Sequence, residues 1–435
     1  VNDQRVKEAR LKAGDVLRVG AHEFVLTEDS ESDRAGLVES SEDNAAPEQE
    51  EADKGWAGVL ITVIEELPPK DMPVESLTII EASGRPSAAL SGSSDGPAAV
   101  RLLLQAASKS RATDIHIEPK SDVYHVRMRV DGQMVSIASL PGRVGELVFG
   151  LVKTACQMRS AARDAVQEGH FSAKFSDRRV EYRVSFTPSV YGQKLVLRVL
   201  DDRSSPKSIT ELGMAGYMSD RVRRVCSQDH GLLLVAGPTG SGKTTTLYTA
   251  LREIDRESRN VVTIEDPVEY QISNVTQIPI DETKGNNFGT LLRSVLRQDP
   301  DVILVGEIRD EETARTAMQA AMTGHLVFST VHAKDTIAAV FRILDLKVEP
   351  YLVANALDLV LGQRLVRVLC DQCKRPTAVS PGQATRLGKY LGGKTQMYVS
   401  TGCPRCLRTG FRGRRAVYEL LDFNDELPDV VLKDA

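Results

Sequence analysis

The sequence predicts an α/β fold for the second half of the chain, with a parallel sheet flanked by helices, and a smaller α+β domain before it. Two observations favour the parallel sheet. An apolar run leads directly into a glycine-rich turn and a helix start, and apolar strands then alternate with helices as far as residue 332. Two C-x-x-C pairs further on predict an inserted metal-binding subdomain. A chain of 435 residues is long enough for such an arrangement of domains.

The glycine-rich turn follows the apolar run Leu232–Ala236 and has the pattern G-x-x-x-x-G-K-T. A buried strand that feeds such a turn and a helix directs backbone N–H groups and the positive helix end toward one point, which suits the phosphates of ATP. A chance glycine-rich turn would not need this strand–turn–helix context. The predicted nucleotide-binding residues are Gly237, Pro238, Thr239, Gly240, Ser241, Gly242, Lys243, Thr244 and Thr245, with Lys243 on the β/γ-phosphates and the Thr244 hydroxyl as a ligand of Mg²⁺.

Glu307 is the first candidate for catalysis. The strand Asp301–Val305 delivers it to the carboxyl end of the sheet, past Gly306, which stands where the usual metal-holding aspartate is expected. A glutamate in this place can accept a proton from the water that attacks the γ-phosphate. The alternative is a surface residue that begins the acidic cap of the next helix, but the intact phosphate loop favours the catalytic interpretation.

Three further residues beside predicted strands are candidates for the same site. Glu265 directly follows a strand and can position Mg²⁺ through water, although the adjoining Asp266-Pro267 also fits a simple turn. His325 and His332 bracket one strand, at its start and just past its end. A lone histidine is more often a structural hydrogen-bonding residue, but two of them beside the nucleotide loops favour a γ-phosphate sensor, above all at His332.

Four cysteines form two C-x-x-C pairs that fit a tetrahedral Zn²⁺ site with a structural role. Disulfides are disfavoured in a reducing cytoplasm, and the spacing differs from that of ferredoxin-type iron–sulfur clusters. The predicted zinc ligands are Cys370, Cys373, Cys403 and Cys406. The two remaining cysteines, Cys156 and Cys226, are predicted to be buried core thiols.

The chain divides by composition into segments. Residues 1–26 predict a β-hairpin, and Leu11–Gly20 resembles the closing hairpin of a forkhead-associated domain, to which no binding is assigned. Residues 27–97 predict a mostly disordered linker, acidic at first and then rich in Ser, Gly and Pro. Residues 98–200 predict the α+β domain and 207–435 the nucleotide domain, with a zinc subdomain at 370–406.

Charge and hydropathy exclude several classes of protein. The net charge is −5, and residues 27–55 alone carry eleven acidic and two basic side chains, or −9, which leaves about +4 for the rest. That balance is too mild to favour nucleic-acid binding. The apolar runs are shorter than a transmembrane helix needs, and no secretory signal is recognised. We therefore expect a cytoplasmic protein that reaches a membrane only through partners.

These motifs together resemble the secretion and pilus-assembly ATPases of the GspE/PilB type (type II/IV secretion system protein E) over residues 98–421. The resemblance rests on Arg111–Pro119, Val126–Gly132, the phosphate loop, Ile264–Tyr270, Leu296–Asp301, Gly306–Asp310, Thr323–His332, the cysteine pairs and Gly410–Glu419. It implies a RecA-like P-loop domain preceded by a small PAS-like domain. It also implies a cytoplasmic homohexamer that hydrolyses ATP and drives an inner-membrane platform, with cytoplasmic docking proteins as further partners.

The same resemblance implies catalytic arginines that neighbouring subunits supply to the site. Arg183 and Arg198 on strands of the smaller domain, and Arg293 and Arg297 in the nucleotide domain, fall on matching motifs. A guanidinium beside the developing γ-phosphate charge raises the rate by orders of magnitude. The chain departs from the family at 164–170, where two positive positions are lost and His170 stands in place of an arginine.

The leading hypothesis is an ATP-driven motor for type II secretion or type IV pilus assembly, and the sequence leaves these two open. A catalytically silent nucleotide-binding scaffold is one alternative, which the altered 164–170 segment favours and the intact Lys243, Thr244, Glu307 and His332 oppose. A DNA-uptake or conjugative secretion ATPase is another.

Overall fold

The computed structural model describes residues 16–19, 22–25, 48–68, 77–201, 205–424 and 426–433. The chain divides into two compact units, Val1–Gly55 and Trp56–Ala435. In the first unit β1 (Val16–Val19) pairs antiparallel with β2 (His22–Val25), as the sequence predicts for this region. Residues 1–15, 20–21 and 26 of the predicted hairpin region and residues 27–47 of the predicted linker lie outside the described residues.

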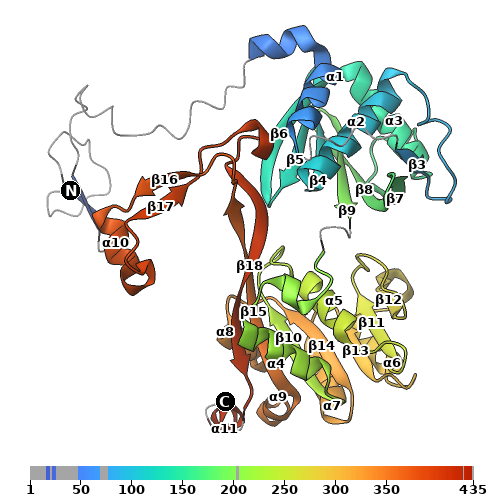
Figure 1. The fold of residues 1–435 in the computed structure, drawn as a ribbon. Helices are drawn as coiled ribbons and strands as arrows, with labels where there is room; N and C mark the ends of the chain where they lie inside the picture. Colours follow the sequence, from blue (N-terminus) through green and yellow to red (C-terminus); the bar gives the residue numbers. More distant parts are fainter. Residues whose placement is uncertain are drawn as a thin grey trace. The chain divides into compact units, whose positions relative to one another are not determined.

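The amino-terminal domain of the second unit is an antiparallel sheet with helices on one face (Figure 1). Its strand order is β3-β7-β8-β9-β4-β5-β6. Its elements are α1 (Glu48–Glu66, interrupted at Gly55), β3 (Thr78–Ile80), α2 (Asp95–Ser110), β4 (Ala112–Pro119), β5 (Val123–Val130), β6 (Gln133–Pro141), α3 (Gly142–Ala155), β7 (Gln167–Lys174), β8 (Arg179–Ser189) and β9 (Gly192–Leu200). Buried and more exposed residues alternate along β4, β5 and β8, so one face packs on the helices and the other is polar, as predicted.

The structure corrects the predicted linker between residues 55 and 97. Leu60 and Ile64 in the second part of α1 and Leu67 directly after it are each at most 1% exposed, and β3 extends the sheet beside β7. Leu90 belongs to the same core. The domain therefore begins well before residue 98. The prediction of a linker relied on the Ser, Gly and Pro content of the segment. Leu60, Ile64 and Leu67 have the i, i+4, i+7 spacing that indicates an amphipathic helix.

The nucleotide domain is a seven-stranded sheet of order β12-β11-β13-β14-β10-β15-β18, parallel except for β18. α4 and α5 pack on one face, and α6 to α9 pack on the other (Figure 1). Its elements are α4 (Gly216–Cys226), β10 (Gly231–Ala236), α5 (Lys243–Glu253), β11 (Val261–Glu265), β12 (Thr276–Pro279), α6 (Phe288–Val295), β13 (Val302–Val305), α7 (Glu311–Met322), β14 (Leu326–Val331), α8 (Thr336–Asp345), α9 (Pro350–Ala356), β15 (Leu357–Leu369), β18 (Phe411–Asp422) and α11 (Leu427–Lys433). The predicted α/β fold with a central parallel sheet is confirmed.

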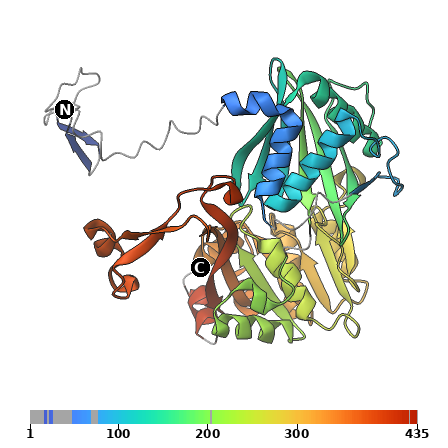
Figure 2. The ribbon, with the colours of Figure 1, turned by 45° about the horizontal axis from the view of Figure 1, so that its top comes forward.

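β15 and β18 continue beyond the sheet as a two-stranded ribbon, which we call the β15–β18 ribbon. β15 is buried between Leu359 and Gln363 and more exposed from Arg364 onward, while its pairing with β18 runs from Leu359↔Asp422 to Leu369↔Phe411. The cysteine-bearing segment is inserted between the two strands and branches from the ribbon end (Figure 2). It contains β16 (Arg375–Ala378), α10 (Pro381–Leu387) and β17 (Gln396–Val399).

Two expectations from the composition concern membrane-spanning helices and the two isolated cysteines. Among the described residues, no helix combines the length and hydropathy needed to cross a membrane. Cys156 and Cys226 are buried, 8% and 4% exposed, and neither forms a disulfide. Burial raises the pKa of each thiol to about 12, so both are inert core residues as predicted.

Candidate active site

The predicted phosphate loop is the turn between β10 and α5. Gly240 and Gly242 have positive φ angles of 75° and 87°, which a side chain would strain. A Cβ on Gly237 would lie 2.5 Å from the backbone oxygen of Gln363, so only glycine fits there. Lys243 Nζ donates to the carbonyls of Gly237 at 3.0 Å and Pro238 at 3.3 Å, which places the ammonium inside the loop. Burial lowers the pKa of Lys243, and the charge of Glu307 partly offsets this.

Gln363 on β15 is a site residue that the sequence analysis missed. It is 4% exposed, and its side-chain amide bridges two parts of the loop region. Its Oε1 accepts from Thr246 Oγ1 at 2.7 Å, and its Nε2 donates to the Ser241 carbonyl at 2.8 Å. The sequence shows only a glutamine that follows the apolar run Leu359–Gly362, and its hydrogen-bond partners lie more than a hundred residues away in the chain.

Glu307 and His332 meet at the carboxyl edge of the sheet, where β13 and β14 end next to the phosphate loop. Glu307 Oε1 lies 3.1 Å from His332 Nε2, and Glu307 Oε2 lies 2.9 Å from the Arg309 guanidinium. The Glu307 side chain is 16% exposed and that of His332 is 45% exposed. Arg309 also lies 3.7 Å from Asp266, so it connects two carboxylates of this edge. The structure thus brings together two residues that the sequence predicted separately.

Glu265 lies at the end of β11 but has a different environment from the one predicted. Its side chain is buried, and its carboxylate accepts hydrogen bonds from Tyr248 Oη, Thr263 Oγ1 at 2.6 Å and Gln277 Nε2 at 3.0 Å. It therefore orders the turn after β11, and the neighbouring Asp266 is the exposed carboxylate at this edge.

Gly306, between β13 and Glu307, leaves little room for a side chain. A Cβ there would lie 3.1 Å from the Ile264 carbonyl oxygen. This close approach of two strand ends favours glycine over the aspartate that is usual at this position.

His325 does not lie at this edge, so the structure does not bring it to the phosphate loop, and its catalytic role stays a prediction. It precedes β14, whereas His332 follows that strand, so roughly 20 Å of extended chain separates them. The register pairs Gly231 with Leu326 and Ala236 with Val331, which places the phosphate loop at the His332 end. His325 Nδ1 instead lies 3.1 Å from the Ala320 carbonyl and closes the turn after α7.

Two of the four predicted arginines lie on the polar face of the amino-terminal sheet. Arg183 on β8 and Arg198 on β9 are directly opposite each other in the register. Arg183 donates to the carbonyl of Val268, in the loop that follows β11 of the same chain. Arg183 thus lies beside the loop after β11 of its own chain, and the predicted supply of arginines by a neighbouring subunit stays a prediction.

The other two predicted arginines have local contacts. Arg293 pairs with Glu312 at the start of α7, and Arg297 donates to the Arg293 carbonyl at 2.8 Å. Their contacts are with α6 and α7 rather than with Glu307, so the structure does not bring them to the phosphate loop.

A cavity of about 890 Å³ adjoins the phosphate loop between the two domains of the second unit. Gly242, Thr245 and Thr246 contribute to its lining from the loop and the first turn of α5. Arg111 and Asp131 line it from the amino-terminal domain, and basic residues of β18 line another wall. Because it begins at the phosphate loop, the cavity has the position and size for the nucleoside part of a nucleotide.

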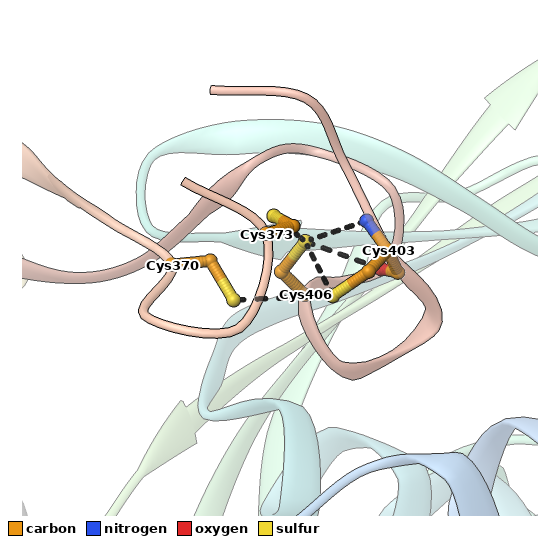
Figure 3. Close-up of side chains that lie close together, drawn as sticks. All are labelled: Cys370, Cys373, Cys403 and Cys406. Atoms are coloured by element: carbon orange, nitrogen blue, oxygen red, sulfur yellow. Dashed lines mark hydrogen bonds between the residues drawn. The ribbon is translucent and has the colours of Figure 1, made fainter. Parts of the chain in front are cut away.

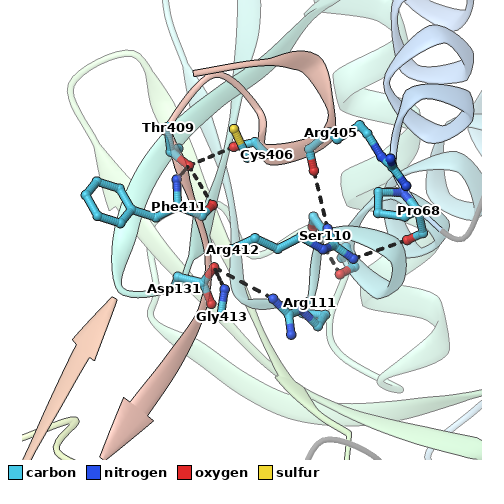
Figure 4. Close-up of polar contacts among 11 residues, drawn as sticks. Pro68, Ser110, Arg111, Asp131, Arg405, Cys406, Thr409, Phe411, Arg412 and Gly413 are labelled. Carbon is cyan, nitrogen blue, oxygen red and sulfur yellow. Dashed lines mark hydrogen bonds and ion pairs between the residues drawn. The ribbon is translucent and has the colours of Figure 1, made fainter. Parts of the chain in front are cut away.

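Backbone and side-chain contacts close one wall of this cavity (Figure 4). The Gly413 amide donates to Asp131 Oδ2 at 2.7 Å, and the Arg111 guanidinium lies 3.9 Å from the same carboxylate. Arg412 donates to the Pro68 carbonyl at 3.4 Å. The start of β18 is thereby attached to the amino-terminal domain.

The four predicted metal ligands form one cluster (Figure 3). Their sulfur atoms all lie within 4.8 Å of one another, with Cys370–Cys403 and Cys373–Cys406 at 3.9 Å and Cys403–Cys406 at 3.7 Å. Four thiolates bound to one zinc ion at about 2.3 Å would be about 3.8 Å apart. The separations match that tetrahedron, whereas a disulfide requires about 2.05 Å. The Gly410 amide also donates to Cys406 Sγ at 3.2 Å, as expected for a thiolate.

Comparison with known proteins places this site in a family. Residues 94–435 match the family described as type II/IV secretion system protein. The chain belongs to this family. The resemblance identified from the sequence motifs is therefore confirmed.

Relatives of this secretion-family chain include ATPases of two machines. The type II secretion system ATPase E of Vibrio cholerae serotype O1 is 39% identical over 336 residues, covering 77% of this chain and 67% of the relative. The type II secretion system protein E of Pectobacterium carotovorum subsp. carotovorum is 37% identical over 423 residues, covering 97% and 80%. The type IV pilus assembly ATPase PilB of Myxococcus xanthus is 39% identical over 345 residues, covering 77% and 60%. The chain thus spans between 60% and 80% of the length of these relatives.

Solved structures agree with the fold. The pilus retraction motor PilT with bound ADP is similar with a TM-score of 0.53 at 27% identity, covering 75% of this chain and 84% of that one. The ATPase DotB of Legionella pneumophila is similar in fold, with a TM-score of 0.58 at 21% identity over 78% of this chain and 84% of that one. With the family and these matches, the chain is a secretion-family ATPase.

The bridge made by Gln363 predicts a graded loss of nucleotide affinity. Gln363→Leu removes the hydrogen bonds to Thr246 and Ser241, so the phosphate loop loses its support from β15. Two bonds at about 1 kcal/mol each predict a Kd for ATP roughly 10- to 30-fold higher. Thr246→Val removes one of them and should raise Kd by about fivefold. Titration of both variants with a fluorescent nucleotide measures this, and wild-type affinity in Gln363→Leu would contradict it.

Proposed function

We propose that this secretion-family ATPase is a motor that assembles pilin-like subunits, as in type II secretion or type IV pili. It would work as a homohexamer at the cytoplasmic face of the inner membrane, attached through a membrane platform and docking proteins. The observation that carries its catalytic part is the meeting of Glu307, His332 and the phosphate loop at one sheet edge. The names of its relatives support both machines.

In the proposed reaction each of these residues has a role. Water attacks the γ-phosphorus, the bond to the β-phosphate oxygen breaks, and Glu307 accepts the proton that the water loses. His332 holds the Glu307 carboxylate from one side and Arg309 holds it from the other. Lys243 neutralises charge on the phosphates. The Thr244 hydroxyl would hold Mg²⁺, which supplies further charge neutralisation between the β- and γ-phosphates.

We further propose that closure of the amino-terminal domain over the nucleotide completes the site. Arg183 already contacts the Val268 carbonyl in the loop after β11, and Arg198 is its cross-strand neighbour. Closure would bring both guanidiniums toward the charge that develops on the γ-phosphate. Hydrolysis is then coupled to movement between domains, as a motor requires.

We also propose one zinc ion in the cysteine cluster. The thiolate separations support it, and the metal would link the two chain segments that leave β15 and enter β18. Its role would be structural, because four protein ligands complete a tetrahedron.

Turnover is expected to require Glu307 while nucleotide binding does not. Glu307→Gln keeps the size of the side chain but cannot accept the proton, so hydrolysis should fall by about 10²- to 10⁴-fold. Glu311→Gln is the matched control, because Glu311 pairs with Arg315 on α7 outside the site. Phosphate release and ATP binding are measured for both. Unchanged turnover in Glu307→Gln would remove it from the mechanism, and a wild-type protein without any turnover would favour the silent scaffold.

Mixed assemblies test where the arginine comes from. Arg183→Ala chains hold the base without the arginine, and Glu307→Gln chains hold the arginine without the base. If Arg183 acts within its own chain, no mixture contains a complete site, so mixing should restore no activity. Co-purification through a tag on one variant confirms that the two chains assemble together. Activity above the sum of the separate variants would show that a neighbour supplies the arginine.

Metal analysis tests the cysteine cluster. Purified protein should contain close to one zinc per chain, and Cys406→Ser should lose it and melt at a lower temperature, because metal binding contributes to folding. Cys156→Ser is a control thiol outside the cluster. Iron in place of zinc, or a metal-free wild-type protein with unchanged melting temperature, would contradict the proposal.

A further inference from the structure

One row of side chains crosses the polar face of the amino-terminal sheet. The strand register places His170 opposite Arg183, Arg183 opposite Arg198, Arg198 opposite Asp114, and Asp114 opposite Arg129. Directly opposite side chains on neighbouring strands lie about 5 Å apart, and like charges destabilise each other there. Three guanidiniums and an imidazole therefore share a single carboxylate.

Asp114 is held in place from several sides. Its Oδ1 accepts from Arg198 Nε at 3.2 Å. Its Oδ2 accepts from Thr113 Oγ1 at 2.8 Å and lies 3.5 Å from Arg129 Nε. The Asp114 side chain is only 11% exposed, whereas that of Arg198 is 59% exposed. The carboxylate is thus a fixed anchor, and the guanidinium extends from it toward the open face.

We propose that Asp114 is a positioning residue for Arg198 in ATP hydrolysis. It engages the inner nitrogen, Nε, which leaves the two outer nitrogens of the guanidinium for a phosphate. Its negative charge also lets Arg198 lie beside Arg183 without net repulsion. This inference rests on the proposed role of the two arginines in charge stabilisation, and it adds a carboxylate that acts only through Arg198.

The same strand offers a matched control at Glu118. Arg127 Nε lies 3.0 Å from Glu118 Oε2, and Lys194 Nζ lies 2.8 Å from Glu118 Oε1. This carboxylate therefore also forms ion pairs with residues of β5 and β9. The Glu118 side chain is 13% exposed, close to the value for Asp114. Burial alone would raise the pKa of Glu118, but the hydrogen bonds from Arg127 and Lys194 lower it to about 2. Its contacts with the basic side chains are shorter than those of Asp114, and it lies outside the row of Arg183 and Arg198.

The experiment compares Asp114→Asn with Glu118→Gln in the full chain. Asp114→Asn should lower kcat and kcat/KM together by about tenfold, because an interaction made in the transition state is weakened. The Kd for ADP and the melting temperature should change no more than in Glu118→Gln, whose turnover should stay at the wild-type level. Equal losses of turnover in both variants would show a structural role of ion pairs on β4 and overturn the proposal.

A double-mutant cycle then tests whether Asp114 acts through Arg198. In the Arg198→Ala background, Asp114→Asn should cause no further loss, since its target is gone. Independent losses that multiply would overturn the proposal. If Arg198→Ala alone leaves turnover unchanged, the arginine role itself fails, and the Asp114 inference fails with it. If Arg198→Ala is impaired but Asp114→Asn is not, only the Asp114 inference fails.

Discussion

The pairing of β15 with β18 is the constraint on which the rest of this molecule depends. The first half of β15 lies in the nucleotide sheet next to β10, and Gln363 at its middle holds the phosphate loop. The second half leaves the sheet, and Cys370 follows directly at its end. The returning strand begins where the Gly413 amide bonds to Asp131 of the amino-terminal domain. Thirteen residues, or about 40 Å of strand, thus connect the phosphate loop, the cysteine cluster and the second domain.

The exposed part of this ribbon cannot be stable by itself, because an isolated pair of strands is marginal in water. Arg367 packs over the Phe411 ring with its guanidinium 4.1 Å from the ring centre, which covers the ribbon near its end. Beyond that point the cysteine cluster joins the two strand ends, and the contact of Gly413 with Asp131 attaches them to the other domain. Metal binding at the cluster would therefore be energetically connected to the position of the amino-terminal domain, since both would stabilise the pairing of the outer ribbon.

Local patterns allowed part of this site to be predicted from the sequence. The phosphate loop and Glu307 each combine a short motif with an adjoining strand, so the chemistry and the position come from the same few residues. Gln363 has no such pattern, because its function arises from strand order, which places β15 beside β10. The position of His325 could not be predicted in the same way, because nearness in sequence to a strand does not say which edge of the sheet a residue occupies. The helix before residue 66 was missed because composition was given more weight than the spacing of its apolar residues.

The charged groups of the site share one property, which is that each already has a partner within the protein. Lys243 donates to loop carbonyls, Glu307 pairs with His332 and Arg309, and Arg198 pairs with Asp114. Charges facing each other across a cleft would otherwise repel or collapse onto one another. In the proposed complex a triphosphate would offer acceptor oxygens to Lys243 and to the outer nitrogens of Arg198, while Asp114 keeps its hydrogen bond to Arg198 Nε. Under the proposed closure, Lys243 of the nucleotide domain and the arginines of the amino-terminal domain would then bind the same phosphates from two sides.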